Sequence, residues 1–350
     1  MPKGKFEEWP KVLGELSQGC DLDAQTAESV LVSVLRGEAT DAQLAAFVVA
    51  LRQKGETVDE LSGLVRAMRS ACIPIECPPE TIDLVGAGGS LLGQKAALNV
   101  STIASFVAAG AGAKVCKHGN RKASSTSGSF DLLEELSIVA ELTSDEVSRC
   151  VDEIGVGFAY ARSFHPAMRF AGQVRAELGI PTVFNLLGPL SHPAAVKRQV
   201  IGVPVVATGK RMAEVLRATG TELAMVVTGD GGLDELSITG PNTVHTVTPG
   251  SISTSQIVPE DIGIARVDEE EILGGDAKEN ARIALQVLEG EASPKREIIS
   301  LNAAAGLFVA GIADNLVDGL ERAHAAIDSG AALECLKNLQ SLTKSMSGHD

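Results

Sequence analysis

The spacing of hydrophobic positions changes once along the chain, near residue 77. Between residues 21 and 72 the apolar side chains recur at intervals of three and four, which is typical of amphipathic helices. Helix-start and helix-stop signals support this interpretation, namely the capping boxes Thr40–Gln43 and Thr57–Glu60 and the glycines Gly37 and Gly55. The pattern predicts an all-helical domain in residues 1–77, ended by the proline-rich segment CIPIECPPE.

Beyond this segment, short apolar runs alternate with helical patterns. Strand, glycine turn, helix and strand in this order predict a mostly parallel central sheet flanked by helices. The predicted strands lie in IDLVGAGG, AKVCKHG, GVGFAYA, QVIGVPVV and LAMVVTGDGG, and helices begin at about Asn99 and about Ser127 and fill the last fifty residues. The predicted fold class is therefore α/β, with a small all-helical domain and a larger α/β domain over residues 78–350. Helices from about 167–190 are expected to join the helical domain.

The composition narrows the class of protein. Of the 350 residues, 45% are hydrophobic but only 3% are aromatic, so the core must consist mainly of Ala, Val, Leu and Ile. A formal net charge of -15 opposes binding to a nucleic acid backbone. Six cysteines without a CxxC pair indicate reduced thiols, and no apolar run reaches the roughly 18 residues that span a bilayer. We expect a cytoplasmic protein with no nucleic acid or membrane partner.

Polar and glycine residues follow the predicted strands, where ligands bind in parallel sheets. In VGAGGSLLGQKAALNVST the glycines allow backbone N–H groups to approach an anion, and the helix start that follows favours a phosphate. The candidate residues in this segment are Gly86, Gly88, Gly89, Asn99, Ser101 and Thr102. A tight turn and an ordinary helix cap would also explain them.

The segment KHGNRKASSTSG, residues 117–128, concentrates hydrogen-bond donors in an acidic protein. Its charges, amide, imidazole and hydroxyls favour binding of a small anion over a merely solvated loop. The candidate donors are Lys117, His118, Asn120, Arg121, Ser124 and Ser125, with Ser129 leading into the next helix.

Two further segments carry charge. Asp234 and Glu235 are adjacent carboxylates behind glycines, and such oxygen ligands hold Mg²⁺ while substrate phosphates complete the coordination. Arg169 and Arg175 lie on one predicted helix, and Arg175 is flanked by apolar residues, so it could clamp a carboxylate in a cleft or pair with a surface glutamate. The following NLLGPL has no cap of its own and is interpreted as a buried turn at a domain junction.

Taken together and in this order, these segments resemble the anthranilate phosphoribosyltransferases of tryptophan biosynthesis, from Leu22 to about Leu342. The segments that carry the resemblance are KHGNR, SSTSGS, HPAMR, VFNLLGPL, GLDELS and GGDAKENA. The resemblance implies Mg²⁺-dependent transfer of phosphoribose from phosphoribosyl pyrophosphate to the amine of anthranilate. It also implies a homodimer formed through the helical domain.

The resemblance assigns roles by position. Donor binding falls to Gly86, Gly89, Ser90, Asn99, Ser101, Thr102, Lys117, Gly119, Arg121, Ser124, Ser125 and Ser129. Metal binding falls to Ser101, Asp234 and Glu235, and anthranilate binding to Gly86, Asn120, His165 and Arg175. His118, Asn120 and Arg175 would be the catalytic residues.

The chain departs from the family in its first glycine loop. Ala87 and Ser90 stand where the family has threonine and aspartate, and the loop to Asn99 is about three residues longer. Lys95, Ala97 and Phe130 also differ from the usual residues. These differences bear on donor binding.

The sequence alone leaves three other functions open. A paralogue could use another aromatic acceptor or bind the donor poorly. A pyrimidine nucleoside phosphorylase-like enzyme shares the two-domain plan, although Arg175 and the Asp234–Glu235 pair argue against it. A non-catalytic relative could bind a nucleic acid or protein partner, although the acidity opposes nucleic acid.

Overall fold

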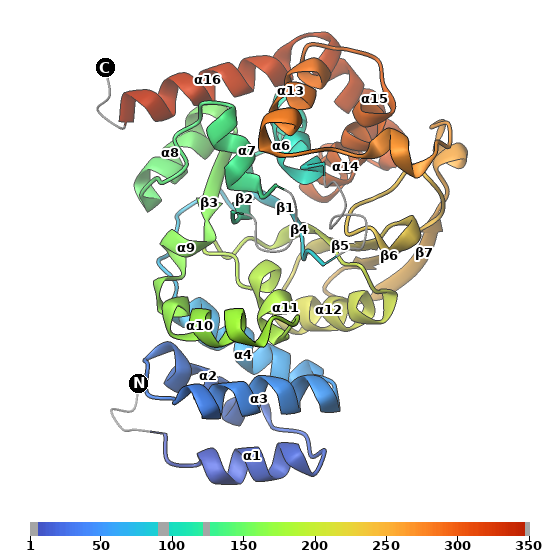
Figure 1. Cartoon of the computed structure of the whole chain (residues 1–350). Coiled ribbons are helices and arrows are strands. Elements are labelled where there is room, and N and C mark those ends of the chain that lie inside the picture. Colours follow the sequence, from blue (N-terminus) through green and yellow to red (C-terminus); the bar gives the residue numbers. More distant parts are fainter. Residues whose placement is uncertain (1–5, 90–97, 122–126, 347–350) are drawn as a thin grey trace.

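The computed structural model describes residues 6–89, 98–121 and 127–346. A small helical domain comes first, and its helices are α1 (Trp9–Ser17), α2 (Ala24–Leu35), α3 (Asp41–Lys54) and α4 (Val58–Ala71). Both predicted capping boxes are confirmed, since Thr40 and Thr57 accept from the N3 backbone and the N3 side chains bond back. Figure 1 shows this domain in blue, below the rest of the molecule.

The larger domain is built on one sheet, and the α/β fold class is confirmed. Its strand order is β3-β2-β1-β4-β5-β6-β7, parallel from β3 to β5 and antiparallel from β5 to β7. The strands are β1 (Ile82–Gly86), β2 (Val115–Gly119), β3 (Val156–Tyr160), β4 (Arg198–Gly202), β5 (Leu223–Thr228), β6 (Asn242–Val247) and β7 (Ile252–Ile257). The five predicted strands are the parallel ones, so their carboxyl ends meet at one edge.

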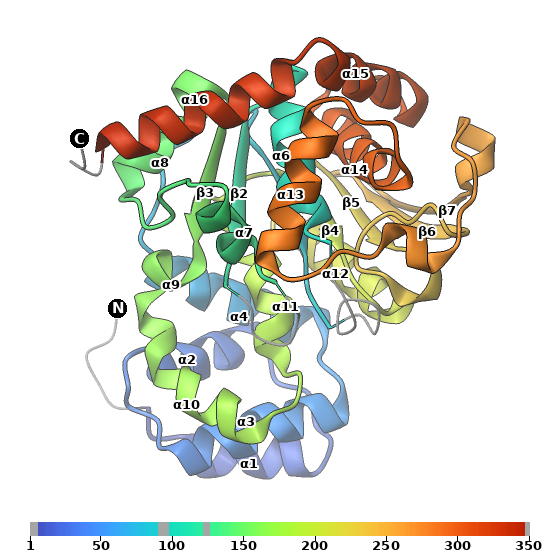
Figure 2. The ribbon, with the colours of Figure 1, turned by 45° about the horizontal axis from the view of Figure 1, so that its top comes forward.

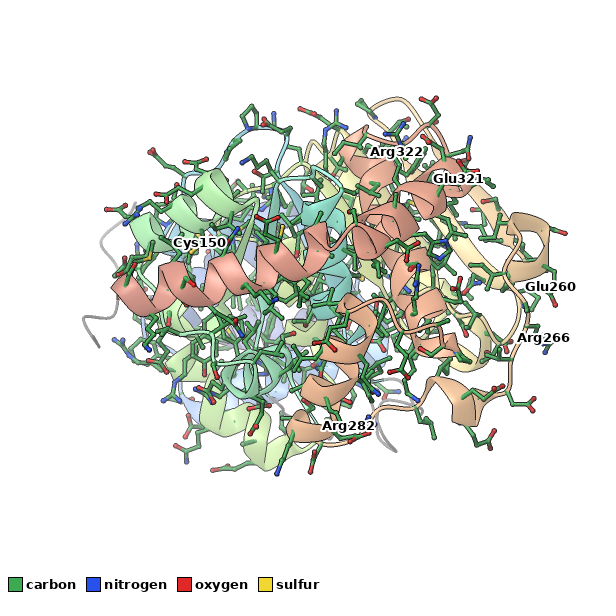
Figure 3. The ribbon with its side chains drawn as sticks, turned by 90° about the horizontal axis from the view of Figure 1, so that it is seen from above. Cys150, Glu260, Arg266, Arg282, Glu321 and Arg322 are labelled. Carbon is green, nitrogen blue, oxygen red and sulfur yellow. The ribbon has the colours of Figure 1, made fainter. Side chains whose placement is uncertain are left out.

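Helices cover the sheet. They are α6 (Val100–Gly110), α7 (Ser129–Glu135), α8 (Ser144–Ile154), α9 (Ala161–Phe164), α10 (Arg169–Leu178), α11 (Val183–Leu190), α12 (Val206–Ala218), α13 (Ala277–Leu288), α14 (Pro294–Ala310), α15 (Leu316–Asp328) and α16 (Ala331–Met346). Short 3-10 helices span Pro166–Met168, Asp230–Gly232, Pro259–Ile262 and Glu269–Ile272. Figure 3, from the side opposite the helical domain, shows α16 crossing the molecule and Glu321 and Arg322 of α15 at its outer margin.

Two hydrophobic cores hold the layers. One joins the sheet to α6, α14, α15 and α16, and it includes the fully buried Phe106 and Phe130. The other joins the helical domain to α10, α11 and α12, through residues such as Phe47, Val174 and Leu187. Figure 1 shows α10 and α11 between the helical domain and the sheet, and Figure 2 shows α10 in front of the helical domain. The two domains therefore contact each other through α10, α11 and α12.

The interpretation of NLLGPL as a turn was wrong. Residues 183–190 form α11, and Asn185 Oδ1 accepts from the N–H of the N-cap residue Thr182 at 3.1 Å, whereas the Thr182 hydroxyl has no partner among the described residues. The capping residue lies three positions before the first residue of NLLGPL. The sequence indicated a turn because the segment NLLGPL was considered from Asn185 onward, without the N-terminal residues of the helix.

Candidate functional site

The end of β1 is packed against the acidic loop after β5. The Gly88 N–H donates to Asp234 Oδ2 at 2.8 Å. A Cβ on Gly86 would lie 2.6 Å from the same oxygen, and one on Gly202 would lie 1.8 Å from the Asp234 carbonyl oxygen. Gly202 therefore requires glycine because the Asp234 backbone occupies the space, whereas a side chain on Gly86 would displace the end of the Asp234 side chain.

The three predicted metal ligands lie together. The Ser101 N–H donates to Glu235 Oε1 at 3.3 Å, and the serine hydroxyl also bonds this carboxylate. Burial, and then the neighbouring Asp234, raise the pKa of Glu235 to about 7. Two carboxylates and a hydroxyl are an oxygen donor set that fits Mg²⁺ with phosphate or water in the remaining positions. Thr102 differs, because it is fully buried and its hydroxyl has no partner within the described part of the chain.

Lys117 lies beneath this carboxylate pair. Its side chain is 1% exposed, and Nζ donates to the Leu84 carbonyl oxygen at 2.5 Å. Burial lowers the pKa of Lys117, whereas the charges of Asp83, Glu235 and Asp234 raise it. The ammonium thus faces the acidic loop from inside the sheet, where it balances negative charge.

The start of α6 is held by contacts between Asn99 and other segments of the chain, and not by a side-chain cap within the helix. Asn99 makes no capping bond with its own helix, and its Nδ2 donates to the Ser127 carbonyl oxygen at 3.2 Å. Its Oδ1 accepts from the Ser127 hydroxyl at 2.9 Å and from Asn280 Nδ2 at 2.8 Å. Asn280, on α13, is fully buried and also accepts from the Gly275 N–H. Sequence reasoning missed Asn280 as a site residue, although it lies in the segment GGDAKENA.

The residues of the basic segment 117–128 have different surroundings in the structure. Gly119 approaches Ser129 closely, since a Cβ on the glycine would lie 3.0 Å from the serine Cβ. Arg121, which is predicted to hold the donor, forms an ion pair with Glu134 and lies with its Cζ 5.8 Å from the Tyr160 ring centre. The hydrogen bonds to Glu134 raise the pKa of Arg121. Two predicted residues of this segment, Ser124 and Ser125, lie outside the described residues, as do Ser90, Lys95 and Ala97 of the first loop.

A pocket of about 730 Å³ lies next to the acidic loop, between the domains. It is lined by all the residues predicted to bind anthranilate or to act in catalysis, namely Gly86, His118, Asn120, His165 and Arg175. Met68 of the helical domain and Phe184 and Asn185 of α11 complete its wall and were not predicted. In the sequence these three residues belong only to apolar or capping patterns, and such patterns do not mark a binding site.

The charged side chains that line this pocket are all basic. Arg162, Arg169 and Arg175 line it, and none of its described lining residues is acidic. The Arg175 guanidinium carbon lies 5.3 Å from the Phe184 ring centre, and burial lowers the pKa of Arg175. No glutamate pairs with it among the described residues, so the cleft interpretation of Arg175 holds and the surface pairing does not. Such a pocket suits an aromatic carboxylate.

Two neutral histidines form the pocket wall, and a third supports them. The His118 ring centre lies 5.2 Å from that of His165 and 5.5 Å from that of His192. Burial lowers the pKa of His118 well below its usual value and that of His165 to about 4. His192 was not predicted; its Nε2 donates to the Cys116 carbonyl oxygen at 2.7 Å because its Nδ1 accepts from the Ala194 N–H.

Both wall histidines have one ring nitrogen inside the protein. The Nε2 atoms of His118 and His165 are buried and have no hydrogen-bond partner among the residues described. The backbone of Gly188 at His118 and of Ser191 at His165 acts against burial and raises the two pKa values.

Comparison with protein families gives two matches. Residues 10–72 match the helical bundle domain of a glycosyl transferase family, and residues 78–333 match the a/b domain of the same family. The anthranilate phosphoribosyltransferase of Rhodococcus jostii is 46% identical over 97% of this chain and 94% of its own.

Solved structures agree with this match. The anthranilate phosphoribosyltransferase of Thermus thermophilus is 38% identical and superposes with a TM-score of 0.89, covering 95% of this chain and 99% of its own. The enzyme of Saccharomyces cerevisiae in complex with PRPP and Mg is 28% identical with a TM-score of 0.86, covering 96% and 98%.

Proposed function

Because the chain belongs to the anthranilate phosphoribosyltransferase family, we propose that it transfers phosphoribose from 5-phosphoribosyl 1-pyrophosphate to the amine of anthranilate. The products are N-(5-phosphoribosyl)anthranilate and pyrophosphate. This activity makes the chain a pentosyltransferase that acts in tryptophan biosynthesis. A single observation carries the proposal: Gly86 lines the arginine-rich pocket and also touches Asp234 of the acidic loop. An acceptor site and a metal–diphosphate site therefore share a wall.

The acidic loop and the start of α6 form the proposed donor side. Asp234, Glu235 and the Ser101 hydroxyl hold Mg²⁺, which neutralises charge on the pyrophosphate. The donor lies along the ends of β1 and β2, beside Asn99 and the positive end of α6, which favours its phosphates. Lys117 contributes from below as a buried positive charge. Placement and electrostatics provide most of the catalysis here.

The pocket forms the proposed acceptor side. Arg175 binds the anthranilate carboxylate, held in place by the Phe184 ring. His118 and His165 line the pocket beside the amine as neutral rings, because burial lowers both pKa values. The bond from C1 of ribose to pyrophosphate breaks as the C–N bond forms.

The oligomeric state and the location of the protein in the cell are also proposals. We infer a homodimer formed through the helical domain, and the exposed apolar side chain of Val49 on α3 supports a contact there. A cytoplasmic location is proposed from the composition. Among the described residues, the helices are too short or too polar to cross a bilayer.

Loss of anthranilate fluorescence tests the proposal directly. Purified protein is mixed with Mg²⁺, phosphoribosyl pyrophosphate and anthranilate, and then with each component left out in turn. We expect turnover only in the complete mixture. Anthranilate binding without turnover would instead favour a paralogue with another acceptor or donor, and turnover of a pyrimidine nucleoside with phosphate would favour the phosphorylase alternative. If neither binding nor turnover occurs, the chain is a non-catalytic relative.

A further inference from the structure

The chain directly after the two carboxylates of the acidic loop is held by a side chain from another element. Asn302, on α14, accepts from the Leu236 N–H through Oδ1 and donates from Nδ2 to the Leu236 carbonyl oxygen, both at 2.9 Å. Nδ2 also donates to the Ile298 carbonyl oxygen of the same helix at 2.9 Å, and the residue is 1% exposed. Two of the three bonds of this buried amide therefore go to one residue of the acidic loop.

A second asparagine makes the same pair of bonds to the next residue. Asn242, at the start of β6, accepts from the Ser237 N–H at 2.6 Å, and its Nδ2 donates to the Ser237 carbonyl oxygen at 2.9 Å. Nδ2 also lies 3.2 Å from the Ile257 carbonyl oxygen and 3.3 Å from that of Gly240. Asn242, Ser237 and Leu236 are all fully buried. Each asparagine thus bonds one backbone residue as a residue of a neighbouring antiparallel strand would.

The two asparagines hold the chain from different elements. In an extended segment the N–H and C=O groups of one residue point to one side, and those of the next residue point to the other. Leu236 bonds to Asn302 of α14 and Ser237 bonds to Asn242 of β6, so this segment is fixed between the helix and the strand. A shift along the chain would leave buried backbone groups without partners, and each such group costs about 1–3 kcal/mol.

The carboxylates themselves lie on a bend just before this segment. The chain bends at Asp234 and Glu235, although neither residue is a glycine or a proline. Side chains of adjacent residues in an extended chain point to opposite faces, so the bend is what allows both carboxylates to reach one site. A Cβ on Gly202 would overlap the Asp234 carbonyl oxygen, and one on Gly229 would overlap that of Glu235. The bend is therefore packed against the ends of β4 and β5.

We propose that Asn302 and Asn242 are positioning residues for the metal site, and that their amides keep the carboxylates of Asp234 and Glu235 together before Mg²⁺ binds. This inference rests on the proposed function, because that function assigns Mg²⁺ to the two carboxylates. Adjacent like charges repel each other, and the sequence of the bend has no turn residue that would resist this repulsion. The bonds to Leu236 and Ser237 provide the resistance, as outer hydrogen bonds orient the ligands of a metal site.

Binding of pyrophosphate in the presence of Mg²⁺ tests the inference without turnover. Pyrophosphate is titrated into the protein in excess Mg²⁺ in a calorimeter, and the dissociation constants of the variants are compared. Asn302→Leu keeps a side chain of similar size but removes the amide, so we expect the dissociation constant to rise at least about tenfold.

Thr343→Val is the matched control for the loss of a buried hydrogen bond. Thr343 is fully buried on α16, and its hydroxyl accepts from the Val139 N–H at 3.3 Å. Because neither residue belongs to the metal site, we expect this variant to lose some stability and to keep the wild-type dissociation constant.

Kinetics separate positioning from a loss of folded protein. In Asn302→Leu we expect the Mg²⁺ concentration for half-maximal rate to rise about tenfold, with the KM for anthranilate changing less than about twofold. Saturating Mg²⁺ should restore most of kcat. A merely structural role would lower kcat at every Mg²⁺ concentration. Asn242→Leu is the second variant and should change the Mg²⁺ dependence in the same direction.

Amide hydrogen exchange of the wild-type protein gives a result even if neither variant folds. Without Mg²⁺, we expect the amides of Leu236 and Ser237 to exchange as slowly as those of β5, because both are buried and bonded to fixed side chains. Fast exchange of both amides would show that the loop is not held before the metal binds, and would overturn the inference.

The outcomes distinguish this inference from the proposed function. A wild-type dissociation constant and a wild-type Mg²⁺ dependence in whichever variant folds overturn the positioning role and leave the proposed function intact. A wild-type protein that binds pyrophosphate with Mg²⁺ but shows no turnover overturns the proposed function, and the variants still decide the positioning role. Wild-type pyrophosphate binding that does not depend on Mg²⁺ overturns the metal site and the inference together.

Discussion

A side chain on Gly86 and the carboxylate of Asp234 would occupy the same space, because a Cβ there would lie 2.6 Å from Oδ2. Gly86→Ala is therefore expected to push the carboxylate away from Glu235 while the fold stays intact, since the end of a side chain can move. We expect the Mg²⁺ concentration for half-maximal activity to rise about tenfold or more, as when a metal ligand loses its orientation. Titration of the initial rate with Mg²⁺ measures this.

Two other glycines serve as references for that variant. Gly202→Ala would place Cβ 1.8 Å from the Asp234 backbone, so we expect it to lower the melting temperature far more than Gly86→Ala does. Gly14 lies within α1 and has no atom near its missing Cβ, so Gly14→Ala should keep both stability and Mg²⁺ dependence. Equal effects of the Gly86 and Gly14 variants on Mg²⁺ dependence would refute the contact as a determinant of the metal site.

Arg175 provides the second prediction. Arg175→Lys keeps the positive charge but loses the planar group that lies over Phe184 and can bind a carboxylate through two parallel bonds. We expect the KM for anthranilate to rise at least about tenfold, with a smaller effect on the KM for phosphoribosyl pyrophosphate. Arg149→Lys is the matched control, because Arg149 lies exposed on α8 and pairs with Glu153. If the Arg175→Lys variant keeps the wild-type KM, the carboxylate is bound elsewhere.

The third prediction concerns Asn280, which the sequence did not reveal as a site residue. Asn280→Asp replaces the Nδ2 donor to Asn99 by an oxygen, and two oxygens then face each other in a buried position. Asn99 should turn, so we expect a higher KM for phosphoribosyl pyrophosphate and little change in the KM for anthranilate. Steady-state kinetics, in which the concentration of each substrate is varied in turn, measure the two KM values separately. The reverse pattern would place Asn280 on the acceptor side.

The sequence predicted the fold class and the five parallel strands, because each depends on local pattern, whereas the residues that line the acceptor pocket were assigned from the family resemblance. Neither could predict partners that come from distant elements. Asn99 was interpreted as part of a phosphate site or as a helix cap, and neither interpretation included its partners Ser127 and Asn280. His192 lies beyond a helix that was interpreted as a turn. The antiparallel strands β6 and β7 were missed because both are rich in polar residues and neither contains a continuous apolar run.

The surroundings of Lys117 and Arg121 could not be predicted from composition. Both were grouped with phosphate ligands because a run of donors in an acidic chain suggests an anion site. In the structure Lys117 on β2 is buried and Arg121 pairs with Glu134, and their roles in donor binding stay predictions. Side chains alternate across a strand, so successive residues of the segment KHG face opposite sides, and no composition count carries that information.

Acid should destabilise the protein through His165, which is the last prediction. Burial lowers the pKa of His165 from 6.5 to about 4 in the folded state, whereas the unfolded chain keeps the ordinary value. Between these two pKa values the unfolded chain binds more protons, so the free energy of unfolding rises with pH from about 4 to about 6.5 and is flat above. The shift corresponds to about 3 kcal/mol.

In His165→Gln we expect the pH dependence of the free energy of unfolding in this range to lose about one proton of linkage. Urea unfolding at about pH 5 and about pH 7 measures the difference, because the linkage acts at the first and is absent at the second. His118 and His192 still contribute in the same direction, since burial also lowers their pKa values. An identical slope in the wild type and the variant would mean that burial does not hold His165 neutral in the folded protein.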